Sequence, residues 1–276
     1  MIPWPLLLLS AALLGLVVGS FLNVVIHRLP IMLERRWRRE CATFLGQEVE
    51  EGARLDLLYP PSHCPHCGHR IKAGENIPLL SYLLLRGRCS ACRAPISPRY
   101  PLVEFLTAAL SVLVVWRFGP SLQAAFALPL VWALIALSFI DLDRQILPDE
   151  ITLPVLWAGL LASLIPVFAD PESSILGAAA GYLLLWGVYQ AFRLLTGKEG
   201  MGYGDFKLLA LLGAWLGWQA LPLIILIASL AGSLVGIALI LLKGHHRDTP
   251  IPFGPFLALG GFIALLWGQE IMRFWI

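Results

Sequence analysis

The sequence contains few charged residues. Asp, Glu, Lys and Arg make up only 14% of its 276 residues, whereas 58% of the residues are hydrophobic. Soluble domains carry about 25% charged residues, so this composition excludes an ordinary soluble protein. The formal net charge of +2 is too small to indicate a nucleic-acid partner. With a mean hydropathy of +0.76, the chain is expected to cross a membrane several times.

Other features that would indicate different protein classes are also missing. The first apolar stretch has no basic segment before it and no small-residue cleavage site after it, so we interpret it as a membrane helix rather than a signal peptide. No strand pattern leads into a GxGxxG sequence, which argues against a Rossmann domain. No internal repeat or low-complexity tract is visible.

Long apolar stretches predict an all-α polytopic membrane protein with about eight transmembrane helices. A span needs about 17 to 25 apolar residues. Stretches that can serve as spans lie at 5–26, 102–116, 122–140, 151–168, 175–195, 220–242 and 253–267. An eighth, 206–218, rises only about 20 Å as a helix, so it is either a short span or a re-entrant segment.

The distribution of basic residues predicts the orientation and the domains. All but Arg117 and Arg273 of the 20 Lys and Arg fall on the side that carries the loop 27–101. By the positive-inside rule this loop is cytoplasmic and both termini are periplasmic. We therefore expect a first transmembrane helix at 1–26, a cytoplasmic domain at 27–101 and a seven-helix membrane domain at 102–276.

Four of the five cysteines form two CxxC pairs in the predicted cytoplasmic loop. They are Cys64, Cys67, Cys89 and Cys92, with 21 residues between the pairs. This spacing is typical of a tetrahedral zinc site, and four thiolate ligands leave no open position, so the zinc is expected to be structural. A reducing cytoplasm disfavours disulfides. Gly68 fits the tight turn after the first pair.

The histidines near these cysteines and the fifth cysteine are not expected to bind the metal. His63, His66 and His69 can substitute as zinc ligands, but with four cysteines available we interpret them as surface residues. Cys41 is interpreted as an inert thiol.

Polar residues near the first two spans have alternative interpretations. Asn23 is expected to make an interhelical hydrogen bond, and His27 and Arg28 to mark the water boundary. The run 34–56 predicts an interfacial helix followed by a polar connector. Glu104, just inside the second span, either pairs with Arg99 or contacts a ligand.

Asp141 and Asp205 are the strongest candidates for a catalytic site. Each adjoins an apolar stretch, where an ionisable side chain is costly and usually functional. Two predicted spans separate them, so both are expected at the cytoplasmic edge. Paired carboxylates that share a proton suit aspartyl-protease chemistry. Gly202 and Gly204, in the sequence GMGYGDFK, leave room for a substrate backbone beside Asp205.

Neighbouring charged residues are alternative partners for these aspartates. Asp143 adjoins Arg144 and is interpreted as a solvated charge, and Asp149 as the N-cap of the following helix. Lys207 either pairs with Asp205, contacts lipid phosphate or extends to the interface as an ordinary lysine.

The wording and order of the motifs resemble the type IV prepilin peptidase family over nearly the whole chain. The motifs are GSFLNVVIHRLP, the two CxxC pairs, RYPLVE, DLDRQILPD, GMGYGDFK and PIPFGP. The resemblance implies a bifunctional inner-membrane enzyme. Such an enzyme removes the basic leader from prepilins or type II secretion pseudopilins on the cytoplasmic side, then methylates the new N-terminal residue with S-adenosylmethionine.

Applied to this sequence, the resemblance implies that Asp141 and Asp205 are the catalytic aspartates and that the four cysteines bind zinc. The methyl-donor site rests on the resemblance alone. We place it at the boundary of the loop and the membrane, with Arg99, Glu104 and His27 as candidates.

Two rival functions remain open from the residues themselves. Two membrane acids also suit a proton-coupled transporter, although this function gives no reason for the zinc loop. A presenilin-like protease that cuts within membrane spans is disfavoured, because the acids lie at the membrane edge.

Overall fold

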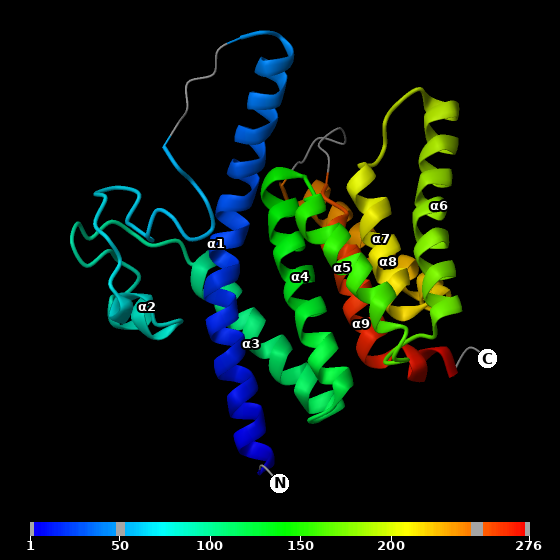
Figure 1. Cartoon of the computed structure of the whole chain (residues 1–276), viewed down its shortest axis with the longest axis horizontal. Helices are drawn as coiled ribbons and strands as arrows, with labels where there is room; N and C mark the ends of the chain where they lie inside the picture. The colour runs from blue at the N-terminus through cyan, green and yellow to red at the C-terminus, as the bar shows by residue number, and fades with distance from the viewer. Residues whose placement is uncertain (1–2, 48–52, 244–250, 274–276) are drawn as a thin grey trace. The chain divides into compact units, whose positions relative to one another are not determined.

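The computed structural model describes residues 3–47, 53–243 and 251–273, and it is almost entirely helical (Figure 1). Within these ranges there is no β-strand, only two isolated antiparallel bridges, His63 with Arg70 and Arg88 with Pro95. The helices in chain order are α1 (Trp4–Phe44), the 3-10 helix η1 (Ala73–Asn76), α2 (Leu80–Leu84), α3 (Arg99–Phe118), α4 (Leu122–Arg144), α5 (Asp149–Ala162), α6 (Pro171–Thr196), α7 (Tyr203–Leu216), the 3-10 helix η2 (Trp218–Ala220), α8 (Leu221–Lys243) and α9 (Gly254–Arg273).

All eight predicted apolar stretches form helices, and six of the helices are long and apolar enough to cross a membrane. The chain is therefore a multi-pass membrane protein. The two exceptions are α5 and α7, with 14 residues each. Each rises about 21 Å, less than the roughly 30 Å hydrocarbon core. The expected full span at 151–168 is too long, because Pro166 cannot continue a helix and disfavours a helical residue before it.

The chain divides into two compact units, Met1–Trp116 and Arg117–Ile276, which we call the N-terminal and C-terminal units. The N-terminal unit contains α1, the cysteine-bearing insertion and most of α3. The C-terminal unit contains α4 to α9. The functional boundaries expected at residues 26 and 101 stay a prediction.

In the N-terminal unit, α1 and α3 pack through small residues. A Cβ added at Gly15 would lie 2.6 Å from the Cα of Ala108, and one at Gly19 would lie 2.7 Å from the Cα of Glu104. Spacing of four residues places both glycines on one face of α1, where they let the two backbones approach closely. The Asn23 side chain donates to the carbonyl oxygen of Tyr100 at 3.1 Å, which confirms the predicted interhelical hydrogen bond.

α1 continues 18 residues beyond the predicted end of the first helix at residue 26. Residues 34–44 are helical as predicted, but they continue the first helix without a break instead of forming a helix of their own. Residues 31–44 consist mainly of good helix formers, and the helix ends just before Gly46, whose φ of 65° suits a left-handed C-terminal turn. Part of the predicted connector, 48–52, lies outside the described residues.

Arg28 is a structural anchor rather than a simple marker of the water boundary. Its side chain is only 8% exposed. It donates to the carbonyl oxygens of Asp56 at 3.0 Å and Pro60 at 2.6 Å. The guanidinium thus joins α1 to the first turn of the insertion.

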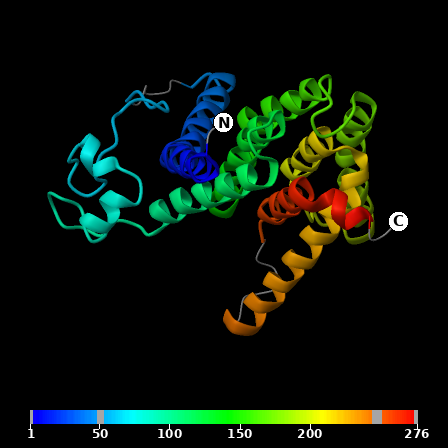
Figure 2. The same cartoon turned by 90° about the horizontal axis from the view of Figure 1, so that it is seen from below.

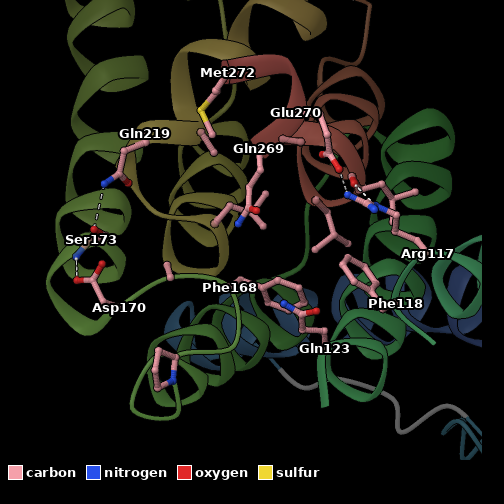
Figure 3. A pocket seen from close by; sticks show the side chains of 17 residues that line it. Arg117, Phe118, Gln123, Phe168, Asp170, Ser173, Gln219, Gln269, Glu270 and Met272 are labelled. Carbon is pink, nitrogen blue, oxygen red and sulfur yellow. Dashed lines mark hydrogen bonds and ion pairs between the residues drawn. The ribbon is translucent and has the colours of Figure 1, made fainter. Parts of the chain in front are cut away.

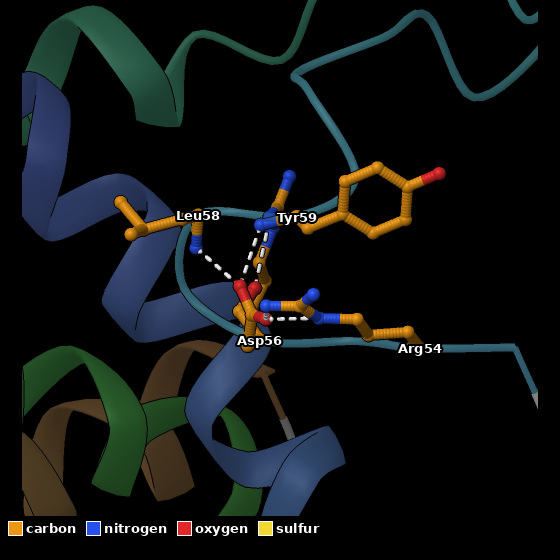
Figure 4. A network of polar contacts seen from close by, with 5 residues as sticks. Arg54, Asp56, Leu58 and Tyr59 are labelled. Carbon is orange, nitrogen blue, oxygen red and sulfur yellow. Dashed lines mark hydrogen bonds and ion pairs between the residues drawn. The ribbon is translucent and has the colours of Figure 1, made fainter.

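That turn is ordered by the carboxylate of Asp56 (Figure 4). Oδ1 accepts the backbone amides of Leu58 at 2.8 Å and Tyr59 at 2.6 Å, and Oδ2 accepts the Arg54 guanidinium at 2.8 Å. The Tyr59 and Leu58 amides, followed by Arg54, hold the pKa of Asp56 below its ordinary value of 3.8. Hydrogen bonds to the charged form cause this direction of shift.

The C-terminal unit is built around α7, from which nearly every residue between Phe206 and Trp215 is buried. α6 packs closely against it, because a Cβ on Gly177 or Gly213 would overlap the carbonyl oxygen of the other. By contrast, Figure 2 shows the second half of α8 extending away from the other helices of this unit, where many of its apolar side chains are exposed, whereas its first half packs against α9, with Ile224 beside Gly260.

Candidate active site and metal centre

Asp141 lies in the last turn of α4, and its side chain is only 5% exposed. Its Oδ2 accepts the backbone amide of Gly254, the first residue of α9, at 3.0 Å. A Cβ at Gly254 would lie 2.7 Å from the same oxygen, so a larger residue there would displace the carboxylate. The start of α9 therefore fixes the position of Asp141.

Asp205 lies in the first turn of α7 and is 8% exposed. Gly202 is the N-cap of this helix, and its carbonyl accepts the Asp205 amide at 3.2 Å. A Cβ at Gly204 would lie 2.8 Å from the Cβ of Leu147, so glycine is required here for the turn after α4 to approach α7. A carboxylate at a helix N-terminus is also favoured by the helix dipole.

The structure brings Asp141 and Asp205 to one junction, because Gly254 lies against both Asp141 and Leu147, and Gly204, next to Asp205, lies against the same Leu147. α4 ends where α7 and α9 begin, so all three helix ends meet at one side of the C-terminal unit. Leu147 contributes to this junction, because its side chain lies beside both Gly204 and Gly254. Within the described part of this unit no other acidic residue is buried, and Asp143 and Glu150 are exposed.

Lys207 pairs with Asp149 and not with Asp205, which was one of its expected partners. Its Nζ lies 2.7 Å from Asp149 Oδ1 and 2.8 Å from Oδ2. Asp149 is the first residue of α5, and Pro148 is the N-cap, so the predicted N-cap role of Asp149 is wrong. The pair joins the starts of α5 and α7 at the rim of the site. Because both side chains are partly exposed, its contribution to stability is modest.

Aromatic residues flank the Asp205 turn. Tyr203 is half exposed, and its ring lies 5.6 Å from that of Tyr189 and 5.3 Å from that of Phe206. The contributions of Tyr189, Leu147 and Gly254 to this region were not predicted from the sequence. Gly254 could have been found, because it lies in the PIPFGP motif. Leu147 could not, because nothing distinguishes one leucine from the many other apolar residues of this sequence.

The four cysteines form a compact cluster in the insertion. Their sulfur atoms all lie within 4.8 Å of one another, and the Sγ atoms of Cys64 and Cys92 are 3.8 Å apart. A tetrahedral site with metal–sulfur bonds of about 2.3 Å has sulfur atoms roughly 3.8 Å apart. The cluster can therefore hold a metal ion.

Backbone geometry supports thiolates at this cluster. Each pair is followed by a residue with positive φ, Gly68 at 71° and Arg93 at 62°, whose amide donates to the carbonyl oxygen of the first cysteine of its pair. The predicted tight turn at Gly68 is confirmed. The amides of Cys67 and His66 lower the pKa of the Cys64 thiol to about 7, and the amides of Cys92 and Ala91 lower the pKa of Cys89. The His69 amide acts in the same direction on Cys67, but burial and the neighbouring thiols outweigh it and raise the pKa of Cys67 to about 12, so the thiolate is favoured at Cys64 and Cys89 and not at Cys67.

The histidines and the fifth cysteine lie outside this cluster. His63 Nδ1 lies 3.0 Å from the Pro61 carbonyl oxygen, and His69 Nε2 lies 3.2 Å from Glu75. His66 adjoins the cluster in sequence, but the group of potential metal ligands consists of the four cysteines. Cys41 is an exposed free thiol on α1.

The methyl-donor candidates lie where α1, α3 and the insertion meet. Glu104 is buried, and its Oε2 accepts the amide of Leu79 at 2.8 Å. The bond between Asn23 and Tyr100 places the first turn of α3, which contains Arg99, beside the turn of α1 that precedes His27. Glu104 thus links α3 to the insertion.

Two family profiles match successive parts of the chain. The Bacterial Peptidase A24 N-terminal domain matches residues 13–118, and the Type IV leader peptidase family matches residues 128–237. No solved structure matches the chain significantly.

Three relatives, each named prepilin leader peptidase/N-methyltransferase, are similar over almost the whole chain. The protein of Aeromonas hydrophila is 58% identical and covers 100% of this chain and 95% of its own length. The protein of Pseudomonas putida is 59% identical and covers 95% of this chain and 91% of its own length. The protein of Legionella pneumophila is 48% identical and covers 99% of this chain and 96% of its own length. These names give no support to a transporter. The chain belongs to the type IV leader peptidase family.

Proposed function

We propose that the chain is a prepilin leader peptidase that cleaves prepilins or type II secretion pseudopilins and then methylates the new N-terminal residue. Its relatives carry this name, and it shares 48% to 59% of their residues. The observation that carries the site assignment is the meeting of two buried carboxylates, Asp141 and Asp205, at the ends of two helices. These are the catalytic residues of the proposal.

The two carboxylates can divide the steps of peptide hydrolysis between them. The ionised one takes a proton from a water molecule whose oxygen attacks the scissile carbonyl carbon, and the protonated one donates to the carbonyl oxygen. When the tetrahedral intermediate collapses, its hydroxyl proton returns to the pair. The leaving nitrogen takes the other proton as the C–N bond breaks. The Gly254 amide holds one oxygen of Asp141, which leaves the other oriented for this exchange.

The position of the site at helix ends suits a substrate that is cut at the membrane boundary. An apolar substrate helix can remain in the bilayer while its boundary peptide bond lies beside the aspartates. Gly202 leaves room for an extended backbone there, because a Cβ added to it would meet no atom closer than 3.9 Å, whereas the space beside Gly204 is filled by Leu147. The positive-inside rule supports a cytoplasmic location for this face and for the insertion, in a bacterial inner membrane with both termini periplasmic.

The test is cleavage of a purified prepilin by the wild type and by the variants Asp141→Asn and Asp205→Asn. Each change keeps the side-chain shape and removes the acid, so both variants are expected to lose cleavage by a factor of at least about 10³. Asp143→Asn, two residues further along the same helix, is the matched control and should cleave normally. Retained cleavage by either dyad variant would contradict the assignment.

The cysteine cluster is proposed to hold zinc. Four thiolates in tetrahedral geometry favour this ion over harder cations. Only Cys64 and Cys89 are buried among the described residues from 53 to 98, so this insertion has almost no apolar core. A bound ion would cross-link its two turns and thereby supply the stability that a core provides elsewhere.

S-adenosylmethionine is proposed to supply the electrophilic methyl group, in agreement with the names of the relatives. Glu104 would accept a hydrogen bond from the cofactor, and Arg99 and His27 would lie beside it. The donor set fits, because a buried carboxylate and two basic residues suit a zwitterionic amino acid.

Transfer of labelled methyl groups to a pre-cleaved pilin tests this placement. Glu104→Gln should reduce transfer while cleavage of intact prepilin continues, which excludes general misfolding. Unchanged transfer would remove Glu104 from the methyl-donor site.

A further inference from the structure

A cavity lies at the end of the C-terminal unit opposite to the aspartates. Its volume is about 510 Å³. Its walls come from the first turns of α4 and α6, the segment before α6, the end of α7 with η2, the second half of α9 and the last two residues of α3. Asp141 and Asp205 lie at the other ends of α4 and α7. Because α4 and α9 are candidate membrane spans, the cavity lies at the depth of the lipid headgroups on the other membrane face.

The cavity has polar groups on two sides and aromatic rings on its floor (Figure 3). On one side Arg117 pairs with Glu270 and donates to the Leu266 carbonyl oxygen at 2.7 Å. Across the cavity, Gln219 donates to Ser173 Oγ at 3.1 Å, and the Ser173 amide donates to Asp170 at 3.0 Å. The side chains of Phe118 and Phe168 contribute the apolar surface.

The charges of the lining favour a ligand that carries a cation. Arg117 is the one basic residue among the lining side chains, whereas Asp170 and Glu270 are both acidic, so the lining has a net charge of −1. The amide of Ser173 holds the pKa of Asp170 below its ordinary value, so this carboxylate stays ionised at neutral pH. An anionic ligand would therefore be repelled by an excess of negative charge.

One atom of the cavity lining lacks a hydrogen-bond donor. Among the described residues, Glu270 Oε2 is a buried atom without a hydrogen-bond partner, although the Glu270 side chain as a whole is 46% exposed and Oε1 of the same carboxylate is paired with Arg117. A buried carboxylate oxygen without a donor is costly. A ligand with an N–H group would relieve that cost.

We propose that this cavity binds the headgroup of a zwitterionic phospholipid with a primary ammonium, of the phosphatidylethanolamine type. The ammonium would donate to Glu270, and the phosphate would lie within reach of Arg117 and the glutamine amides. The glycerol and acyl chains would extend along the apolar surface toward the bilayer. This function is separate from peptide cleavage, because the cavity and the aspartates lie at opposite ends of the same helices.

The experiment measures which lipid stays bound to the full-length protein. Protein purified in mild detergent is mixed with equal amounts of phosphatidylethanolamine, phosphatidylglycerol and phosphatidylcholine with identical acyl chains, and bound lipid is counted by native mass spectrometry. Phosphatidylethanolamine should dominate. Phosphatidylcholine keeps the positive charge but has no N–H donor, so it should bind less, and phosphatidylglycerol should bind least.

Glu270→Gln should reduce retention of phosphatidylethanolamine about tenfold, as expected for the loss of one charge-assisted hydrogen bond. Glu172→Gln is the matched control, because it makes the same change in the first turn of α6 but Glu172 does not line the cavity. Cleavage of prepilin by both variants shows that they are folded. Equal retention of the three lipids, or an equal loss in the Glu172 variant, would overturn the proposal.

Discussion

The two units of the chain are stabilised in different ways. In the C-terminal unit, α7 is buried among its neighbours and the candidate catalytic carboxylates are held by close approach of helix backbones. In the insertion of the N-terminal unit, the described residues 53–98 bury only two side chains, both of them cysteines. Order there depends on hydrogen bonds to backbone groups and on the cysteine cluster. The comparison predicts that single changes act by different mechanisms in the two units.

The largest effect is expected at the cysteine cluster. Replacing both buried cysteines, Cys64→Ser and Cys89→Ser, removes two of four metal ligands from a segment without a core. Structural zinc contributes about 10 kcal/mol or more to the folding of small metal-binding domains. Bound zinc should fall from about one ion per chain to almost none, and the insertion should become sensitive to proteases.

Metal analysis and limited proteolysis of the purified full-length variant measure this effect. Cys41→Ser is the control, because Cys41 is exposed and lies outside the cluster. The melting temperature of the C-terminal unit should change little. Full zinc occupancy without Cys64 and Cys89 would contradict the assignment of the metal site.

In the C-terminal unit, stability is expected to be most sensitive to a change at the close backbone contact between α6 and α7. Gly177→Ala would place a methyl group on the carbonyl oxygen of Gly213, where α6 meets α7. Overpacking of this kind costs about 1–3 kcal/mol or more, so the melting temperature in detergent should fall while zinc content is unchanged. Gly187→Ala on the same helix meets no atom within 4 Å and should not destabilise the protein. Equal melting of the two variants would exclude a critical contact at Gly177.

These two regions also show what the sequence could and could not predict. The apolar stretches predicted the helices. Asp141 and Asp205 lie at the same end of the C-terminal unit as expected, although the crossing count behind that expectation assumed a full span at 151–168, where α5 has only 14 residues. The spacing of the cysteines predicted their cluster. Such features are visible because they depend on composition, periodicity or local spacing.

Contacts between distant segments were not predictable in the same way. Leu147 lies beside Gly204 and Gly254, and Lys207 pairs with Asp149, only because the end of α4 converges with the starts of α5, α7 and α9. A leucine in an apolar sequence carries no mark of such a contact. The length of α1 was also missed, because hydropathy shows where a span ends but not where its helix ends.

A moderate effect is expected at Arg28, the anchor between α1 and the insertion. Arg28→Met keeps the apolar stem but leaves the carbonyl oxygens of Asp56 and Pro60 without their charged donor. The loss should be about 1.5–3 kcal/mol, and amide hydrogen exchange should rise locally from residue 53 to residue 60. Arg38→Met, on an exposed part of the same helix, is the control. Exchange that rises equally in both variants would contradict an anchoring role.

The smallest effect is expected at Asp56, because its carboxylate lies at the surface of the insertion. Its pKa is lowered by the amides of Tyr59 and Leu58 and by Arg54, so its stabilising contribution is complete above the ordinary pKa of 3.8 and is lost as pH falls through the lowered value. Protection of the Leu58 and Tyr59 amides from hydrogen exchange, relative to intrinsic rates, should therefore decrease below about pH 4. In Asp56→Asn the protection should be lower at neutral pH and independent of pH in this range. A wild type whose protection does not change on acidification would show that the turn is held by Arg28 and the backbone alone.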